Sequence, residues 1–178
     1  MRTRAVGCVP LLALFFAGAA TAQSGRWAVG TGALAPTGEY STHDKLGWHA
    51  VGAFTTASFS HGLLGLRLEA LYGRTPRKTT GYGASQLFGF GSSLELHPAH
   101  ATAFPYLLGS LGYYWLEEGT VSGPAPTPVH GMTVGGGAGA ALRLAGLGAF
   151  LETRFIGGPA RNGVNFIPIT VGISFGAP

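Results

Sequence analysis

Charged residues and cysteines are both scarce in this sequence. Only 10% of the 178 residues are charged, whereas a soluble domain usually carries about 25%. Hydrophobic residues make up 46% of the chain, and the 31 glycines follow no three-residue period, which excludes collagen. The aromatic content of 11% and the low charge exclude an intrinsically disordered chain. This composition favours a folded chain that exposes much apolar surface, and such a surface usually faces lipid.

Long apolar runs are absent except near the start of the chain. Residues 9–20 form an apolar stretch that is too short to cross a bilayer as a helix. A basic start precedes this stretch, and Ala20-Thr21-Ala22 follows it with the small-x-small form that signal peptidase reads. We therefore predict a cleaved signal peptide over residues 1–22 and a single domain over residues 23–178. The alternative is that residues 1–22 remain as a membrane anchor.

Loss of the signal peptide would also simplify the chemistry of the chain. The only cysteine, Cys8, lies inside it, so the mature chain has no disulfide and no thiol chemistry. Loss of Arg2 and Arg4 leaves nine of the 11 basic residues against seven acidic ones, a formal charge of nine minus seven, or +2. This balance, without a basic stripe, speaks against a nucleic-acid partner.

Apolar residues alternate with small or polar ones through most of the mature chain, which is typical of β-strands. The clearest case is the C-terminus, where Ile169, Val171 and Ile173 alternate with Thr170, Gly172 and Ser174. The pattern leaves open which way the side chains of residues 46–60, 104–116 and 131–145 face. In all it predicts eight strands, at residues 26–36, 46–60, 63–74, 83–97, 104–116, 131–145, 148–157 and 165–176.

The links between these strands alternate in length. The first, third, fifth and seventh are long and polar, the second and sixth are tight, and the fourth is intermediate. This alternation is typical of an outer-membrane barrel with short periplasmic turns and longer external loops. Because hydrocarbon offers the backbone no hydrogen-bond partner, a membrane sheet has to close on itself. We therefore predict an all-β fold, an eight-stranded antiparallel up-and-down transmembrane β-barrel with a side-chain-filled lumen.

Charges on the predicted inward faces balance in sign. An isolated charge in a dry lumen is costly, so we expect these groups to pair. The result is a polar plug, although a selective pore or proton path lined by the same groups is an alternative. The residues concerned are Arg67, Glu69, Glu95, Arg143, Glu152 and Arg154.

Three segments carry a resemblance to a known family. They are residues 104–109 (FPYLLG), 150–155 (FLETRF) and 165–175 (NFIPITVGISF). Through them the whole mature chain resembles the small bacterial outer-membrane β-barrel proteins of the OmpA/OmpX type. The resemblance implies an eight-stranded barrel in a Gram-negative-type outer membrane, assembled there by the barrel-assembly machinery. The chain departs from the family at its end, where Phe175 is followed by three residues instead of being terminal.

The C-terminal third also resembles the lipid A deacylases, another family of eight-stranded barrels, from Glu152-Thr153-Arg154-Phe155 onward. Catalysis in that family needs a His and a Ser two residues apart after the Arg-Phe pair, with an orienting acid. This sequence has Ile156-Gly157-Gly158-Pro159 at that place. We therefore expect no catalytic residues and no enzyme activity.

Two other patterns are weak indications of bound ligands. His97 and His100 have a spacing suited to a metal but no nearby inferred acid or thiol. His43 with Glu39 and Asp44 could bind a divalent cation, but three scattered polar residues in a loop are a weak signal. Residues 135–140 match G-x-G-x-x-A, yet no helix follows them as a dinucleotide site requires. We expect no metal and no cofactor, and assign these glycines to close packing inside the barrel.

The predicted second external loop carries Arg74, Arg77 and Lys78, which could contact the phosphates of lipopolysaccharide. A solvated loop is the alternative. Aromatic residues near strand ends suit the girdles at the two membrane interfaces, namely Trp27, Trp48, Tyr72, Tyr113, Tyr114 and Trp115.

Together these features favour a monomeric, non-enzymatic protein of the outer membrane that serves as a scaffold or contacts surfaces through its external loops. One alternative is a narrow channel, or a transporter from which small apolar solutes leave laterally. A lipid A-modifying enzyme is the third hypothesis.

Overall fold

The computed structural model describes residues 25–59, 63–98, 102–120, 127–144, 146–158 and 165–176. The predicted signal peptide lies outside these residues. The described chain forms one short helix, α2 (Tyr40–His43), and eight strands: β1 (Arg26–Pro36), β2 (Gly47–Phe59), β3 (Leu64–Thr75), β4 (Ser85–Leu96), β5 (Ala103–Glu117), β6 (Val129–Leu144), β7 (Leu147–Gly157) and β8 (Phe166–Gly176).

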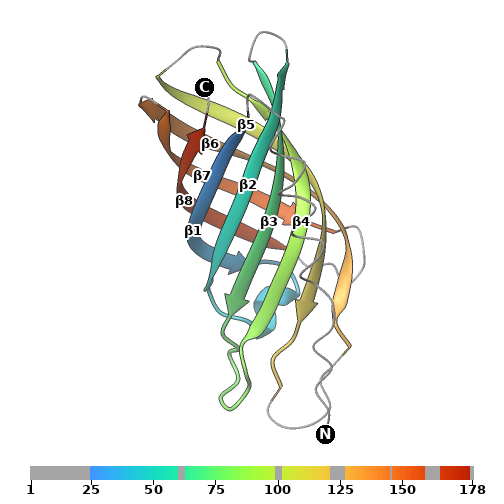
Figure 1. Cartoon of the computed structure of the whole chain (residues 1–178). Coiled ribbons are helices and arrows are strands. Elements are labelled where there is room, and N and C mark those ends of the chain that lie inside the picture. The colour runs from blue at the N-terminus through green and yellow to red at the C-terminus, as the bar shows by residue number, and fades with distance from the viewer. Residues whose placement is uncertain are drawn as a thin grey trace, which may run out of the picture.

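The strands close into a barrel (Figure 1). Each strand pairs antiparallel with the next along the chain, and β8 pairs with β1 over eleven residue pairs, from Arg26–Gly176 to Pro36–Phe166. The predicted eight-stranded up-and-down barrel is therefore confirmed, with strand ends within two residues of those expected. Within the described ranges, the structure has no helix that is long and apolar enough to cross a membrane.

The two ends of the barrel differ in their connections. The links β2–β3, β4–β5 and β6–β7 lie at one end, which we call the turn end, at the top of Figure 1. Helix α2, in the link between β1 and β2, lies at the other end, which we call the loop end. The strand order thus places the predicted external loops together, at the loop end.

Side chains alternate between the lumen and the outer wall along the strands, including the three strands whose facing the sequence left open. Odd-numbered residues of β2 point inward as far as Thr55, such as His49 and Val51, and so do those of β6, such as Thr133. In β5 the even-numbered residues, such as Tyr106 and Leu108, point inward.

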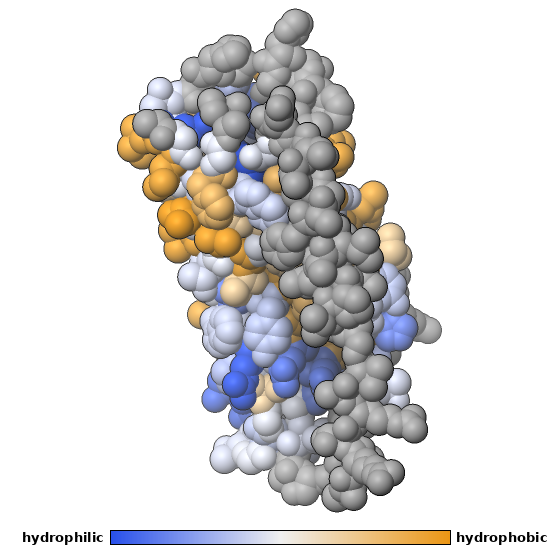
Figure 2. Space-filling model, in the orientation of Figure 1, coloured by the Kyte–Doolittle hydropathy of each residue, from blue (hydrophilic) through white to orange (hydrophobic). Residues whose placement is uncertain are grey.

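The outer wall is apolar. Figure 2 shows hydrophobic residues over the turn-end part of the visible face and hydrophilic residues gathered toward the loop end. Large aliphatic side chains stand at least half exposed on the wall, as in a barrel that faces hydrocarbon: Leu94, Leu96, Leu107, Leu111, Val134, Leu144, Leu147, Leu151 and Val171.

One aromatic residue predicted for the interfacial girdles faces the other way. Tyr114 is only 2% exposed and lies in the lumen. The alternation of β5 explains this, because Tyr113 and Trp115 on either side of it face outward. Tyr113 stacks with the exposed ring of Phe90, and Trp115 lies tilted against the same ring. The inward ring of Tyr114 lies over Gly89 of the neighbouring strand, where a Cβ atom would be 2.0 Å from the ring.

Candidate functional site: the filled lumen

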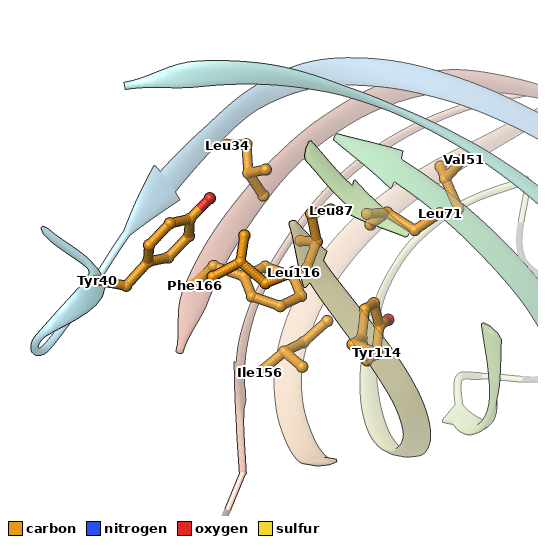
Figure 3. Packing of buried hydrophobic residues seen from close by; sticks show 9 residues of the cluster. All are labelled: Leu34, Tyr40, Val51, Leu71, Leu87, Tyr114, Leu116, Ile156 and Phe166. Carbon is orange, nitrogen blue, oxygen red and sulfur yellow. The ribbon is translucent and has the colours of Figure 1, made fainter. Parts of the chain in front are cut away.

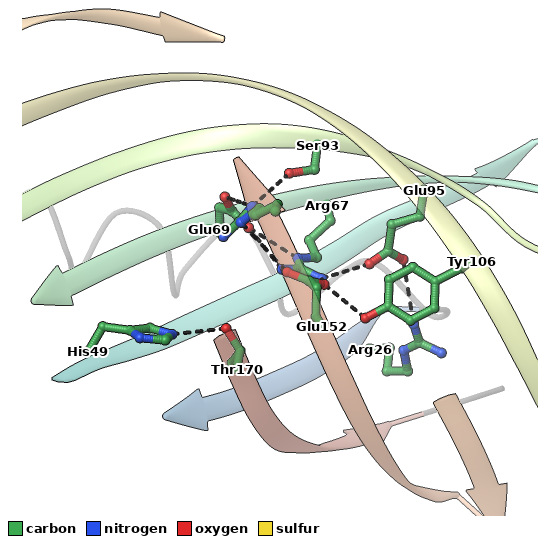
Figure 4. Close-up of polar contacts among 10 residues, drawn as sticks. Arg26, His49, Arg67, Glu69, Ser93, Glu95, Tyr106, Glu152 and Thr170 are labelled. Carbon is green, nitrogen blue, oxygen red and sulfur yellow. Dashed lines mark hydrogen bonds and ion pairs between the residues drawn. The ribbon is translucent and has the colours of Figure 1, made fainter. Parts of the chain in front are cut away.

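Ionised side chains fill the turn-end half of the lumen and centre on Arg67 (Figure 4). The Nη1 atom of Arg67 donates to Glu95 at 2.9 Å and to Glu152 at 2.8 Å, and its Nη2 atom donates to Glu69 at 3.0 Å. The Arg67 side chain is only 5% exposed, so all three ion pairs are shielded from solvent. One guanidinium therefore joins carboxylates from β3, β4 and β7 across the barrel.

Two further arginines complete this cluster, which we call the lumen network. Arg154 pairs with Glu69, and Arg26 lies 3.6 Å from Glu95. Three arginines then face three glutamates, so the network is neutral. Such neutrality is what a buried ionic cluster needs, because a charge without a partner costs several kcal/mol. Its members are Arg26, Arg67, Glu69, Glu95, Glu152 and Arg154.

The strand pattern explains how the network forms. Residues two apart on a strand share a face, so Arg67 and Glu69 leave β3 on the same side, as Glu152 and Arg154 leave β7. The two pairs are 85 residues apart in sequence and meet inside the lumen. Tyr106 adds a hydroxyl that donates to Glu152 at 2.8 Å.

Glycines on β6 make room for these large side chains. A Cβ atom at Gly139 would lie 2.4 Å from the Tyr106 ring, and one at Gly137 would lie 2.4 Å from the Cβ atom of Arg154. The G-x-G-x-x-A match at residues 135–140 therefore lies within a strand and permits close packing, as predicted from the sequence.

Arg143 faces the lumen as predicted but does not join the network. Within the described part of the chain it makes no ion pair, and its Nε atom is buried without a hydrogen-bond partner. Its guanidinium instead lies 4.7 Å from the centre of the Phe104 ring. The prediction that Arg143 pairs with the other lumen charges is therefore wrong. Alternation along a strand determines which side of the sheet a side chain faces, but not how far along the barrel it lies. Arg26, which was not predicted as a lumen residue, supplies the third cation.

Apolar side chains fill the loop-end half of the lumen, where they form a cluster that we call the apolar plug (Figure 3). They come from seven strands and from the loop between β1 and β2, so the packing ties most of the barrel wall together. Its members are Leu34, Tyr40, Val51, Leu71, Leu87, Tyr114, Leu116, Ile156 and Phe166.

A cap of polar contacts covers the apolar plug and is held by Asp44, whose side chain is fully buried. The Thr75 hydroxyl donates to Asp44 at 2.7 Å, and Arg77 donates to it at 3.1 Å. Tyr40 links the cap to the plug through its hydroxyl, which lies 2.5 Å from the Thr75 oxygen, and burial raises the pKa of this phenol. Arg77 also pairs with Glu118 at 3.3 Å. The cap thus joins the first three loops of the loop end.

The three cations predicted to contact lipopolysaccharide therefore have different surroundings. Arg77 is engaged by two carboxylates of the cap. The Lys78 amino group donates to the Ser41 carbonyl oxygen at 2.6 Å. Arg74 alone of the three is exposed with no polar partner among the described residues. The trio is therefore not one free cationic patch.

The space left in the lumen is small. A cavity of about 20 Å³ lies at the turn end, lined by members of the lumen network together with His97, Phe104 and Phe150. This volume accommodates about one water molecule. This cavity therefore has no room for a solute larger than water.

The histidines do not assemble a metal site in the described residues, where no group of three potential ligands occurs. His97 is buried, its ring lies 5.3 Å from that of Phe104, and burial lowers the pKa of its imidazole. His100 lies outside the described residues. Asp44, considered with His43 as a cation ligand, is occupied by Thr75 and Arg77.

Comparison with known proteins places the fold. No family model and no curated protein matches the chain. Among solved structures, Neisserial surface protein A (NspA) matches with a TM-score of 0.64 and 11% identity, over 85% of this chain and 96% of that one. The N-terminal β-barrel domain of Pseudomonas aeruginosa OprF matches with a TM-score of 0.54 and 12% identity, over 86% and 97% of the two chains. A major outer membrane protein from Thermus thermophilus matches with a TM-score of 0.52 and 12% identity, over 85% and 99%.

Identities this low show the fold and nothing finer. The expected resemblance to small outer-membrane barrels is confirmed at that level, and it rests on strand number, closure and near-complete coverage of the compared chains. The chain has the closed eight-stranded β-barrel fold of small outer-membrane proteins.

Proposed function

We propose that this chain is an integral outer-membrane protein that acts as a non-conducting, non-enzymatic scaffold and presents its loop end to the cell exterior. The fold of its structural neighbours and the apolar outer wall support the location. Export by the predicted signal peptide, assembly by the barrel-assembly machinery and a monomeric state belong to the same proposal.

The observation that carries the proposal is the filling of the lumen from both ends. The lumen network occupies the turn-end half, the apolar plug occupies the loop-end half, and the cap covers the plug. Five of the six ionised groups in this neutral cluster are buried, and the Arg26 side chain is 21% exposed. This arrangement favours a rigid interior, since moving one buried member leaves its partner as an unpaired charge. A side-chain-filled lumen is also the usual state of an eight-stranded barrel.

Solute flux tests this proposal. The full mature protein is reconstituted into liposomes, and insertion is checked by heat-dependent mobility on a denaturing gel. Swelling is then measured in sugars of increasing size, with a wide porin as the positive control. We expect swelling at the rate of protein-free liposomes. Size-dependent swelling by inserted protein would contradict the proposal and support the narrow-channel alternative.

The absence of enzyme activity has a separate test. Lipid A is incubated with the reconstituted protein and analysed by mass spectrometry. We expect an unchanged acyl pattern, because β7 continues as Ile156 and Gly157 where a deacylase would need its His and Ser. Loss of an acyl chain would overturn this part of the proposal.

A further inference from the structure

The outer wall carries a cation, Arg74, whose side chain has no partner among the described residues. Arg74 is the penultimate residue of β3 and continues the outward-facing row formed by Leu68, Ala70 and Tyr72. Its side chain is exposed and has no hydrogen bond or ion pair with any described residue. Arg77, three residues further on, is engaged by Asp44 and serves the cap. Arg77 therefore has a structural role in the cap, whereas the side chain of Arg74 has no partner among the described residues.

The height of Arg74 on the barrel suits a lipid headgroup. Tyr72 stacks edge-on against Trp48, with ring centres 5.7 Å apart, and both rings stand outward at the loop end. A strand rises about 3.4 Å per residue and tilts by about 40° in such barrels, so Arg74 lies roughly 5 Å above Tyr72 along the membrane normal. Aromatic side chains of this kind sit at the membrane interface, so the guanidinium lies at the level of phosphates.

The neighbours of Arg74 on the sheet supply further donors. Trp48 pairs with it on β2, and Gln86 pairs with it on β4. The Tyr72 hydroxyl donates to the side-chain amide oxygen Oε1 of Gln86 at 3.1 Å. This leaves the side-chain NH₂ group of Gln86 as a donor on the residue that pairs with Arg74. A phosphate accepts several such hydrogen bonds at once.

A second exposed cation lies close by. Lys45 donates its backbone N–H to Pro76 at 2.8 Å, two residues beyond Arg74, and its side chain is exposed. The acidic residue on this part of the rim is Glu117. It lies opposite Gln86 in the β4–β5 register, so it is two strands away from Arg74. The balance of charge on this part of the rim favours an anion.

We propose that Arg74, supported by Gln86 and Lys45, forms a binding site for the phosphate of a lipid in the outer leaflet, with Trp48 packed against the apolar part of the same molecule. The proposal rests on the membrane location proposed above and adds the residue and the chemical group recognised. A lipid is the expected ligand because the site lies on the outer wall, above the aromatic rings, and not in the lumen.

Binding of defined lipids tests the site. Full mature protein in detergent is titrated with bisphosphorylated lipid A, with the same lipid after removal of its phosphates, and with inorganic phosphate, and bound lipid is counted by native mass spectrometry. We expect Arg74→Gln to weaken binding of the phosphorylated lipid about fivefold, which corresponds to ~1 kcal/mol per basic residue at a lipid surface. Arg74→Lys keeps the charge and should retain most of the affinity.

Lys78→Gln is the matched control, because it removes the same charge from the same end of the barrel while leaving Arg74 in place. Its affinity should stay within twofold of the wild type. Equal losses of lipid affinity in the Arg74→Gln and Lys78→Gln variants would show that a cationic rim attracts the lipid in general, and would overturn the site at Arg74. Wild-type affinity in Arg74→Gln, or equal binding of the dephosphorylated lipid, would overturn the proposal.

Two outcomes separate the sources of failure. Competition by inorganic phosphate at the concentration of lipid would show that the group recognised is free phosphate, and would overturn the lipid assignment. Failure of the wild-type protein to show heat-dependent mobility after insertion into liposomes would instead refute the proposed membrane location. All variants are checked for this mobility, so a loss of binding is compared only among folded barrels.

Discussion

Replacement of Arg67 by Met removes the centre of the lumen network while keeping an unbranched side chain of similar length. The substitution removes one partner from each of three glutamates. Two of them keep a cation, because Glu69 still pairs with Arg154 and Glu95 still pairs with Arg26. Glu152 keeps the Tyr106 hydroxyl and a longer contact of 3.6 Å to Arg154. The net cost is therefore that of one uncompensated buried charge, about 3–5 kcal/mol, and not three times that value.

The free energy of unfolding is measured by urea titration of the protein in lipid vesicles. Arg143→Met is the matched control, because it removes an arginine from the same lumen that has no ion pair with any described residue; losing its contact with Phe104 should cost about 1 kcal/mol or less. Adding Glu152→Gln to Arg67→Met restores neutrality and should recover part of the stability. Equal losses at Arg67 and Arg143, or no recovery in the double variant, would refute a charge-balanced network.

Three other changes probe the cap, the lumen packing and the outer wall. Asp44→Asn should loosen the cap and speed proteolysis of the first loop, with less effect on global unfolding, and protection equal to the wild type would argue against the cap. Gly89→Ala should impair folding because its Cβ atom would meet the Tyr114 ring at 2.0 Å, while Gly109→Ala on the open outer wall should be neutral, as judged by the folded fraction on a gel. Leu111→Arg places a charge on the lipid face and should cost about 2–4 kcal/mol in vesicle unfolding if it lies near the bilayer midplane; a cost under about 0.5 kcal/mol would contradict burial of that wall in lipid.

The fold could be predicted from the sequence because two independent signals agreed. Period-two alternation located each strand to within two residues, and the alternating lengths of the links indicated an even-stranded barrel. The signal was weakest where both faces carry similar residues, as in β5, where aromatics stand at three consecutive positions. Tyr114 was therefore assigned to the outer wall, and only the register with β4 shows that it points inward over Gly89.

The lumen network was predicted less completely, for a geometric reason. Parity along each strand identified the inward charges on β3, β4 and β7, because it needs only local sequence. It could not give the height of a residue relative to other strands, which depends on the stagger of the closed sheet. Arg143 and Arg26 both face inward near the turn end, and the sequence offered no means of deciding which would reach Glu95. The small inward residues that follow Arg26 on β1, namely Ala28, Gly30 and Gly32, are the signal that could have marked it as a lumen residue.

The same limit applied to the loop end, where the cap joins residues from three different loops. Asp44 and Arg77 look like solvated loop charges in sequence, because nothing local shows that one carboxylate will be buried beneath the other loops. Once the barrel is closed, the loops meet over the apolar plug, and burial of Asp44 makes a partner necessary. Arg77 supplies this partner, so its charge is already used in the cap. The side chain of Arg74, on the outward row of β3, has no partner among the described residues. Its environment therefore differs from that of Arg77, although only three positions separate them.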